Sequence, residues 1–335
     1  MPKILITADI HWGLPNKNDD ILWALNKMQQ YAYDNNIDHA FILGDLYHNR
    51  QTSDVIEYHR LLDFFQKSEI EWIVFPGNHD LPKESSWDIS TISLFHNDIT
   101  TIKGIKKIQV DGFNYFIWIL PYIKDESLYV AVLDEINELA SENDILFTHI
   151  GINKALFKMC YMDRETGIND LNFTKFKYII AGHFHNYQQI DNFYYVGSPI
   201  PSRFDEGMVS HGFMTLDEQY NLEFINLFEY DDHPPNYITC TVDELDNIDA
   251  ENNFIRIIIS NEEDKLKYEK KIVELRERGA KQIKIQDKIK PNEVTDNIDH
   301  NDLFNIIKSY IDDVMQPIDG IDKNTLIEMV REIYD

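Results

Sequence analysis

The sequence predicts an α/β fold in which two sheets pack face to face and helices cover their outer sides. Three observations support this prediction. Short apolar runs, typical of buried strands, recur through the first two-thirds of the chain. Segments with apolar residues at helical spacing separate the first three runs, as in parallel α/β proteins. A smaller β-α-β unit follows, in which an amphipathic helix lies between two further strands.

The first half of the chain alternates strands with helices. Strands are expected over 3–7, 41–43 and 72–75, with helices over 20–34 and 53–67 between them. Ser53 is a plausible N-cap of the second helix. The apolar runs on either side of Asp111-Gly112, 102–110 and 115–120, predict a hairpin.

The second half of this region completes the expected second sheet. A helix is expected over 128–142, and strands over 145–147, 178–181, 192–196 and 213–216. We expect the last two of these strands to close the second sheet. The sequence Asp-Asp-His-Pro-Pro at 231–235 then breaks the pattern, because proline disrupts both helices and central strands.

These breaks divide the chain into four expected parts: a first domain over 1–231, a small capping domain over 236–289, a linker over 290–300 and a helical segment over 301–335. The final segment carries two helices with wide apolar stripes. Two such helices cannot bury both stripes against each other alone, so we expect them to pack on another surface.

Composition limits the class of protein. Two cysteines, Cys160 and Cys240, in 335 residues suggest a reducing compartment rather than a disulfide framework. No apolar run has the length of a membrane span, and a strand begins at once where a signal peptide would lie. We therefore expect a cytoplasmic protein without membrane association. Its many Asn, Asp and Ile residues favour an AT-rich bacterial or phage genome.

Five of the apolar runs end in side chains that can bind metals. The carboxyl ends of strands meet at one edge of such a sheet, so these side chains should lie close together. A single residue of this kind is often only a satisfied polar group, but five in order favour a metal site. The seven candidates are Asp9, His11, Asp45, Asn78, His149, His183 and His185. They exceed what one ion needs, which predicts two ions and phosphoester hydrolysis.

Each candidate has an expected role. Asp45 is our choice for the carboxylate that bridges the two ions. Asp9, His11 and one of His183 and His185 would complete the first site, and Asn78, His149 and the other histidine the second. Imidazole with carboxylate and amide oxygens, and no cysteine, suits Mn²⁺ better than structural zinc.

His79 directly follows the ligand Asn78, so its imidazole should lie beside the metals. An imidazole titrates near neutrality and can give a proton to a leaving oxygen. We therefore assign His79 as the general acid or transition-state stabiliser, and Asp80 as the carboxylate that could orient it.

Together these motifs resemble the calcineurin-like metallophosphoesterase superfamily. They are Asp9-x-His11, Gly44-Asp45, Gly77-Asn78-His79-Asp80, His149 and Gly182-His183-x-His185. Further details resemble the SbcD-type DNA repair nucleases, which are nuclease subunits of SMC-like ATPase complexes. Those details are Gly44-Asp45-Leu46-Tyr47-His48, Leu120-Pro121-Tyr122 and Tyr195-Val196-Gly197-Ser198-Pro199. The chain departs from the family pattern at Ser202-Arg203-Phe204-Asp205.

The resemblance implies a two-metal, Mn²⁺-dependent exonuclease and endonuclease on DNA, with His48 assisting His79 at the phosphate. It implies that the small unit is a capping domain that contacts DNA, and that helices such as the one over 54–65 form a homodimer. The C-terminal helices would dock on the coiled coil of an SbcC-type ATPase. The side chains implied in that docking are Leu303, Phe304, Ile307, Tyr310, Ile311, Leu326, Val330 and Ile333.

The net charge of −27 is unusual for a protein that binds DNA, which usually presents a basic face. The charge is uneven: residues 265–290 hold ten Lys or Arg against four Asp or Glu, while 296–335 hold three against ten. We expect the ATPase partner to supply much of the DNA affinity and the face over 265–290 to supply the rest. The simpler interpretation is a solvated helix surface.

Two alternatives remain open from the sequence. A stand-alone phosphatase or small-nucleotide phosphodiesterase would explain the acidity without a partner, but would leave the final helices without a role. A non-catalytic scaffold that only binds an ATPase would need neither His79 nor seven metal ligands.

Overall fold

The computed structural model describes residues 2–50, 54–82, 89–95, 97–152, 175–207 and 209–289. The expected linker and helical pair over 290–335 lie outside the described residues, together with Ser53, Cys160 and every side chain implied in docking the ATPase. Among the helices that are described, none is both long and apolar enough to cross a membrane.

The first sheet has six strands in the order β12-β11-β1-β2-β3-β4. They are β1 Lys3–Thr7, β2 His39–Leu43, β3 Glu71–Phe75, β4 Thr100–Thr101, β11 Gly212–Asp217 and β12 Leu222–Asn226. β1 to β4 run parallel, and β11 lies antiparallel to both β1 and β12.

The strand expected over 213–216 therefore belongs to the first sheet, and the prediction that it closes the second sheet is wrong. Two pairings explain the difference. β1 has β2 on one side, so its other edge needs a partner, which β11 provides. In the second sheet, β10 pairs with β8 and β9 follows as the last strand.

The second sheet also has six strands, in the order β5-β6-β7-β8-β10-β9. They are β5 Lys106–Ile108, β6 Ile117–Leu120, β7 Ile145–His149, β8 Tyr178–Gly182, β9 Gln188–Ile190 and β10 Phe193–Tyr195. β6, β7, β8 and β10 run parallel, and β5 pairs antiparallel with β6 as the expected hairpin. The structure thus confirms two large sheets.

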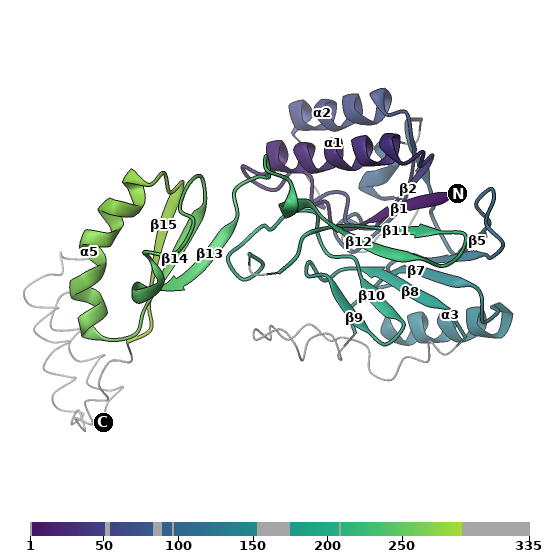
Figure 1. Cartoon of the computed structure of the whole chain (residues 1–335). Coiled ribbons are helices and arrows are strands. Elements are labelled where there is room, and N and C mark those ends of the chain that lie inside the picture. The colour runs from purple at the N-terminus through teal and green to yellow at the C-terminus, as the bar shows by residue number, and fades with distance from the viewer. Residues whose placement is uncertain are drawn as a thin grey trace, which may run out of the picture.

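Helices cover the outer faces of both sheets (Figure 1). α1 Asn18–Asp34 and α2 Val55–Lys67 lie over the first sheet, and α3 Glu126–Leu139 over the second. Short 3-10 turns occur at Thr91–Phe95, Leu227–Glu229 and Val242–Glu244. The N-cap of α2 is Asp54, whose carboxylate accepts from Ile56 and Glu57 N–H groups, rather than the expected Ser53.

A core of apolar side chains holds the two sheets together. Inward side chains of β1 and β2, such as Ile6 and Phe41, meet those of β6 and β7, such as Ile119 and Phe147. All four are fully buried, and the rings of Phe41 and Phe147 meet edge to face with centroids 5.2 Å apart. This packing fixes the position of one sheet relative to the other along the strand direction, and so aligns the ends of their strands.

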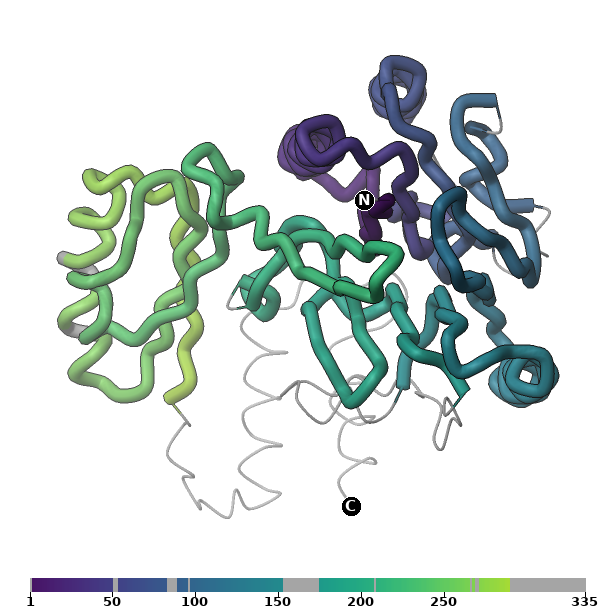
Figure 2. Tube along the Cα trace, turned by 45° about the vertical axis from the view of Figure 1, so that its right-hand side comes forward, coloured from purple at the N-terminus to yellow at the C-terminus, as the bar shows by residue number. Residues whose placement is uncertain are grey.

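A small unit stands beside the two-sheet body in both views (Figures 1 and 2). Its parallel strands are β13 Tyr237–Thr241, β14 Phe254–Ile259 and β15 Gln282–Asp287, with α5 Glu262–Glu277 between the last two. The expected β-α-β arrangement is present, and β13 adds a third strand that the sequence did not indicate. The unit has its own core, which includes Ile255, Ile257 and Leu275.

Acidic neighbours pair with three of the ten basic side chains in the stretch over 265–290. Lys265 pairs with Glu262 and Asp287, Lys267 with Glu263, and Lys271 with Asp246 and Glu274. These exposed pairs contribute little stability, but they neutralise positive charge that the sequence suggested for DNA. For these three lysines, the contacts are those of a solvated helix surface.

We predict that Phe147→Ala lowers the free energy of unfolding by about 3–5 kcal/mol, because the ring is fully buried between the sheets and its loss leaves a cavity. Urea denaturation in the presence of a chelator measures the change. Phe116→Ala is the matched control: its ring is 38% exposed, and its loss should cost less than about 1 kcal/mol. Equal losses in the two variants would contradict this account of the core.

Candidate metal centre

The carboxyl ends of five parallel strands deliver the predicted ligands to one edge of the molecule. β1, β2 and β3 of the first sheet lead to Asp9, His11, Asp45 and Asn78, and β7 and β8 of the second lead to His149, His183 and His185. Asp9, Asp45 and His149 are almost completely buried, with exposed fractions of 1%, 2% and 0%. The structure brings all seven residues together; their roles as ligands stay a prediction.

The backbone at this edge adopts conformations that most residues avoid. φ is positive at Asp9 (52°), His11 (51°), Asp45 (54°) and His183 (111°). Such conformations cost free energy and gather at functional sites, where they aim side chains that an extended strand could not aim. Gly44 has a φ of 85°, and a Cβ there would lie 2.5 Å from His149 Nδ1. Only glycine fits this turn.

One group of possible ligands contains Asp9, His11 and His185. The Nε2 atoms of His11 and His185 lie 3.0 Å apart. The Asp9 carboxylate accepts from the backbone N–H of His183 at 2.9 and 3.1 Å, which fixes its orientation. Burial raises the pKa of Asp9 and lowers that of His11 well below its ordinary value. Burial therefore disfavours the charged form of both side chains.

The second group contains Asn78, His149 and His183. Asn78 Oδ1 lies 3.0 Å from His149 Nε2 and 3.1 Å from His183 Nδ1. His149 Nδ1 donates to the Leu43 carbonyl at 2.8 Å, so Nε2 is the atom that faces the group. Burial, followed by the charge of His149, lowers the pKa of His183 to about 3, which keeps its imidazole neutral and able to bind a cation.

Asp45 lies between the two groups. Its Oδ2 atom is 3.4 Å from His149 Nε2 and 3.8 Å from His11 Nε2, while Oδ1 accepts from the His79 N–H at 2.7 Å. Burial opposes ionisation, but the charge and hydrogen bond of His149 lower the pKa of Asp45 below its ordinary value. An ionised carboxylate between the two groups has the geometry expected of a bridging ligand.

This donor set fits divalent cations because its buried carboxylates need positive charge close to them. Although burial opposes protonation, Asp45 raises the pKa of His149 to about 9. A proton on His149 therefore compensates part of the negative charge of Asp45. The Asn78 carbonyl faces two imidazole nitrogens and the Asp45 carboxylate, an arrangement suited to a cation among them. With the amide reversed, its nitrogen would donate to these atoms and its oxygen would accept from Arg50.

His79 and His48 lie together at the wall of the site. His79 Nδ1 donates to the His48 carbonyl at 2.8 Å, and the two rings stack with centroids 5.5 Å apart. The His79 ring also meets His11 edge to face at 4.8 Å. The hydrogen bond at Nδ1 fixes the ring and makes Nε2 the atom for proton exchange.

The expectation that Asp80 orients His79 is wrong. The Asp80 carboxylate is fully buried and accepts from the backbone N–H groups of Leu46, Tyr47 and Gly77. The His48 carbonyl orients His79 instead. Asp80 thus links the turn after β3 to the turn after β2. Since its carboxylate is directed into the backbone of both turns, it cannot also reach the His79 ring.

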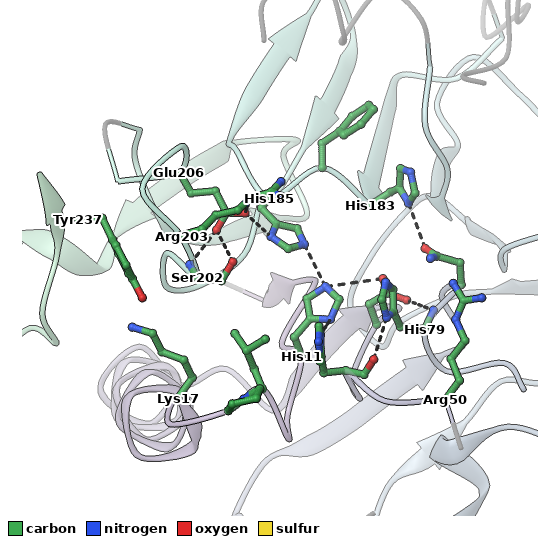
Figure 3. Close-up of a pocket in the computed structure, with 16 residues that line it drawn as sticks. His11, Lys17, Arg50, His79, His183, His185, Ser202, Arg203, Glu206 and Tyr237 are labelled. Atoms are coloured by element: carbon green, nitrogen blue, oxygen red, sulfur yellow. Dashed lines mark hydrogen bonds and ion pairs between the residues drawn. The ribbon is translucent and has the colours of Figure 1, made fainter. Parts of the chain in front are cut away.

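An open cavity of about 630 Å³ lies over the site. His11, His79, His183 and His185 line it (Figure 3), whereas Asp9 and His149 are buried and do not line it. Arg50 and Arg203 approach it from opposite ends. Both guanidinium groups bring positive charge to the cavity, and Arg203 Nε also donates to the Glu206 carboxylate at 2.9 Å.

Glu206 is a site residue that the sequence did not reveal. Its side chain, 1% exposed, accepts from His185 Nδ1 at 2.9 Å. No motif surrounds it, and it lies 21 residues from its histidine. The one available signal was the departure at Ser202-Arg203-Phe204-Asp205, the residues that immediately precede it.

The family model for calcineurin-like phosphoesterases matches residues 2–187, more than half of the chain. The chain belongs to this family. Members of the family use a dinuclear metal site, in agreement with the His and Asp groups described above. As a calcineurin-like phosphoesterase, the protein is a hydrolase that acts on phosphoesters.

Two similar proteins are each described as DNA double-strand break repair protein Mre11. That of Halobacterium salinarum is 30% identical over 94 residues, 26% of this chain and 24% of the relative. That of Archaeoglobus fulgidus is 24% identical over 212 residues, 55% and 46% of the two chains. The chain thus spans less than half the length of these curated relatives. A dimetal phosphatase structure from Danio rerio is 13% identical with a TM-score of 0.43, and the match covers 67% of this chain and 96% of that one.

We predict that this calcineurin-like phosphoesterase binds two Mn²⁺ ions per chain, and that each group can be weakened separately. Asn78→Ala should lower the affinity for one ion, because it removes the carbonyl near His149 and His183. His11→Ala should lower the affinity for the other. Titration followed by the EPR signal of free Mn²⁺ measures both affinities. Asn143→Ala, at an exposed loop position, is the matched control and should change neither. Loss of both ions together in Asn78→Ala would argue against two separable sites.

Proposed function

We propose that this calcineurin-like phosphoesterase is a two-metal DNA nuclease, with exonuclease and endonuclease activity, in an SMC-like ATPase complex for DNA repair, recombination or end processing. The observation that carries the proposal is the juxtaposition of seven predicted ligand side chains, five of which line one open cavity together with His79. Arg50 and Arg203 at opposite ends of this cavity favour a substrate with phosphates on both sides of the scissile one. The DNA repair relatives support the same substrate.

In the proposed reaction, the ligands around Asp45 would hold two divalent ions, most suitably Mn²⁺ given their oxygen and imidazole atoms. Such ions make hydroxide available near neutral pH and hold the non-bridging phosphate oxygens. His79 would protonate the leaving oxygen from Nε2, because its Nδ1 is engaged by the His48 carbonyl. His48 would support this step by stacking on the His79 ring.

The charge of the chain favours a partner. The net charge is −27, and the described lysines Lys265, Lys267 and Lys271 are paired with acidic side chains. Because such a surface repels nucleic acid, we propose that the ATPase supplies most of the DNA affinity, with the segment over 301–335 as its docking element. Val55 and Ile56, exposed on α2, offer an apolar face for a homodimer.

We predict that His79→Gln lowers the rate of DNA cleavage in Mn²⁺ by about 10²–10⁴-fold, the usual contribution of a general acid. Mn²⁺ binding should be retained, because the contact between His79 and Asp45 uses the backbone N–H. Cleavage of a labelled linear duplex and an EPR titration measure the two effects. His59→Gln, on the exposed side of α2, is the matched control. Unchanged cleavage in His79→Gln would remove this residue from its proposed role.

A second prediction concerns the partner. The purified chain should hydrolyse a chromogenic phosphodiester in Mn²⁺ but cut linear duplex DNA slowly, and the co-purified ATPase with ATP should accelerate DNA cutting selectively. The physical reason is that only the larger substrate needs the affinity that the acidic chain lacks. Tight binding of duplex DNA by the isolated chain at physiological salt would contradict this account. Exclusive turnover of small phosphoesters, with or without the ATPase, would favour a stand-alone phosphatase.

A further inference from the structure

Glu206 makes more contacts than a surface carboxylate would. One carboxylate oxygen accepts from His185 Nδ1 and from Arg203 Nε, both at 2.9 Å. The other accepts from the N–H and the hydroxyl of Ser202, both at 2.7 Å. These bonds lower the pKa of Glu206 below its ordinary value although burial opposes ionisation, so the side chain is a fixed anion. It holds the ring of one predicted ligand from behind.

The same short segment touches the three-stranded unit. Asp205, which precedes Glu206, accepts from Arg256 Nη2 on β14 at 2.9 Å. Phe204 meets the Tyr237 ring of β13 edge to face at 5.0 Å, and the Arg256 guanidinium lies 5.1 Å from the Phe204 ring centroid. A Cβ on Gly207 would meet the Tyr237 carbonyl at 1.9 Å, so the two backbones pack closely. Figure 3 shows Tyr237 and Glu206 on the same side of the cavity.

We infer that Glu206 is a positioning residue for His185, and that the segment 202–207 makes the metal affinity on the His11 and His185 side depend on docking of the three-stranded unit. A carboxylate that binds the second nitrogen of a ligating imidazole fixes its tautomer and raises its basicity. Here the tautomer places the proton on Nδ1 and leaves Nε2 facing His11. The inference rests on the two-metal site of the proposed function, but not on DNA as the substrate.

The coupling follows from the length of the connection. Only one peptide bond separates Asp205, which binds Arg256, from Glu206, which binds His185. A displacement of β14 that breaks the first contact therefore reaches the second without a flexible linker to absorb it. The Asn78 and His149 side has no such connection among the contacts described above, so only one of the two ions should respond.

The first test is Glu206→Gln, which keeps the shape of the side chain and removes its charge. The affinity of one Mn²⁺ should fall by about 10–100-fold, the usual effect of losing such a partner, and that of the other should stay constant. Glu206→Ala should give a larger fall at the same site, so that glutamine partly rescues alanine. EPR titration measures both affinities, and urea denaturation of the metal-free variants verifies that each is folded.

The matched control is Glu223→Gln on β12, an exposed carboxylate that pairs with Lys3. It should leave both affinities unchanged. If Glu206→Gln also leaves both unchanged, or lowers both equally, the positioning role is wrong. Should Glu206→Ala fail to fold, the isosteric glutamine variant alone decides the question.

The second test addresses the coupling. Arg256→Ala removes the contact with Asp205 without touching the metal centre, and should lower the affinity of the same Mn²⁺ by about two- to fivefold, as expected for a partly exposed ion pair. Arg276→Ala, exposed near the end of α5, is the matched control. An unchanged affinity in Arg256→Ala would overturn the coupling.

These results are independent of the substrate. A chain that fails to cut DNA but shows the selective loss of one Mn²⁺ would refute the nuclease and keep the inference. A chain that binds no Mn²⁺ would refute both.

Discussion

This molecule depends on the compensation of the negative charge of two buried carboxylates by the groups around them. Asp9 and Asp45 are 1% and 2% exposed, and an ion taken so completely out of water costs several kcal/mol unless it is paired. Backbone N–H groups of His183 and His79 meet part of this cost, and the imidazoles around them supply more when protonated. Since the imidazoles repel one another when charged, protons alone satisfy the site poorly. A pair of divalent ions satisfies carboxylates and neutral imidazoles together, as the family assignment requires.

That requirement explains the local backbone. The ligands must leave the ends of buried strands and turn at once toward a common centre, which the left-handed conformations at Asp9, His11 and Asp45 accomplish. Each is unfavourable alone and persists because its surroundings determine it. The sheet-to-sheet core and Asp80, which binds the turns after both β2 and β3, provide that constraint. The rigid sandwich thus holds the strained turns in place.

Sequence reasoning succeeded where structure is local. A ligand that directly follows an apolar run can be located from the run alone, and the rule that strand ends share an edge brings Asp9, Asp45 and His183 together. It failed where the outcome depends on distant partners. β11 pairs with β1, more than two hundred residues earlier, because β10 already occupies the edge of β8. Asp80 was assigned from its neighbour in sequence, yet its bonds lie with the turn after β2. Glu206 carries no motif, since only the folded chain brings it to His185.

The distribution of charge links the site to the rest of the molecule. Lys265, Lys267 and Lys271 of α5 pair with acidic neighbours, and Arg50 and Arg203 line the cavity, where Arg203 also donates to Glu206. Positively charged side chains therefore line the cavity of a chain whose net charge is −27. Because salt screens exposed charges beyond about 8 Å, these side chains act on an anion mainly at the cavity itself. The three-stranded unit contacts the same segment through Asp205, the residue next to Glu206, so the support of His185 and the contact with that unit lie on adjacent residues.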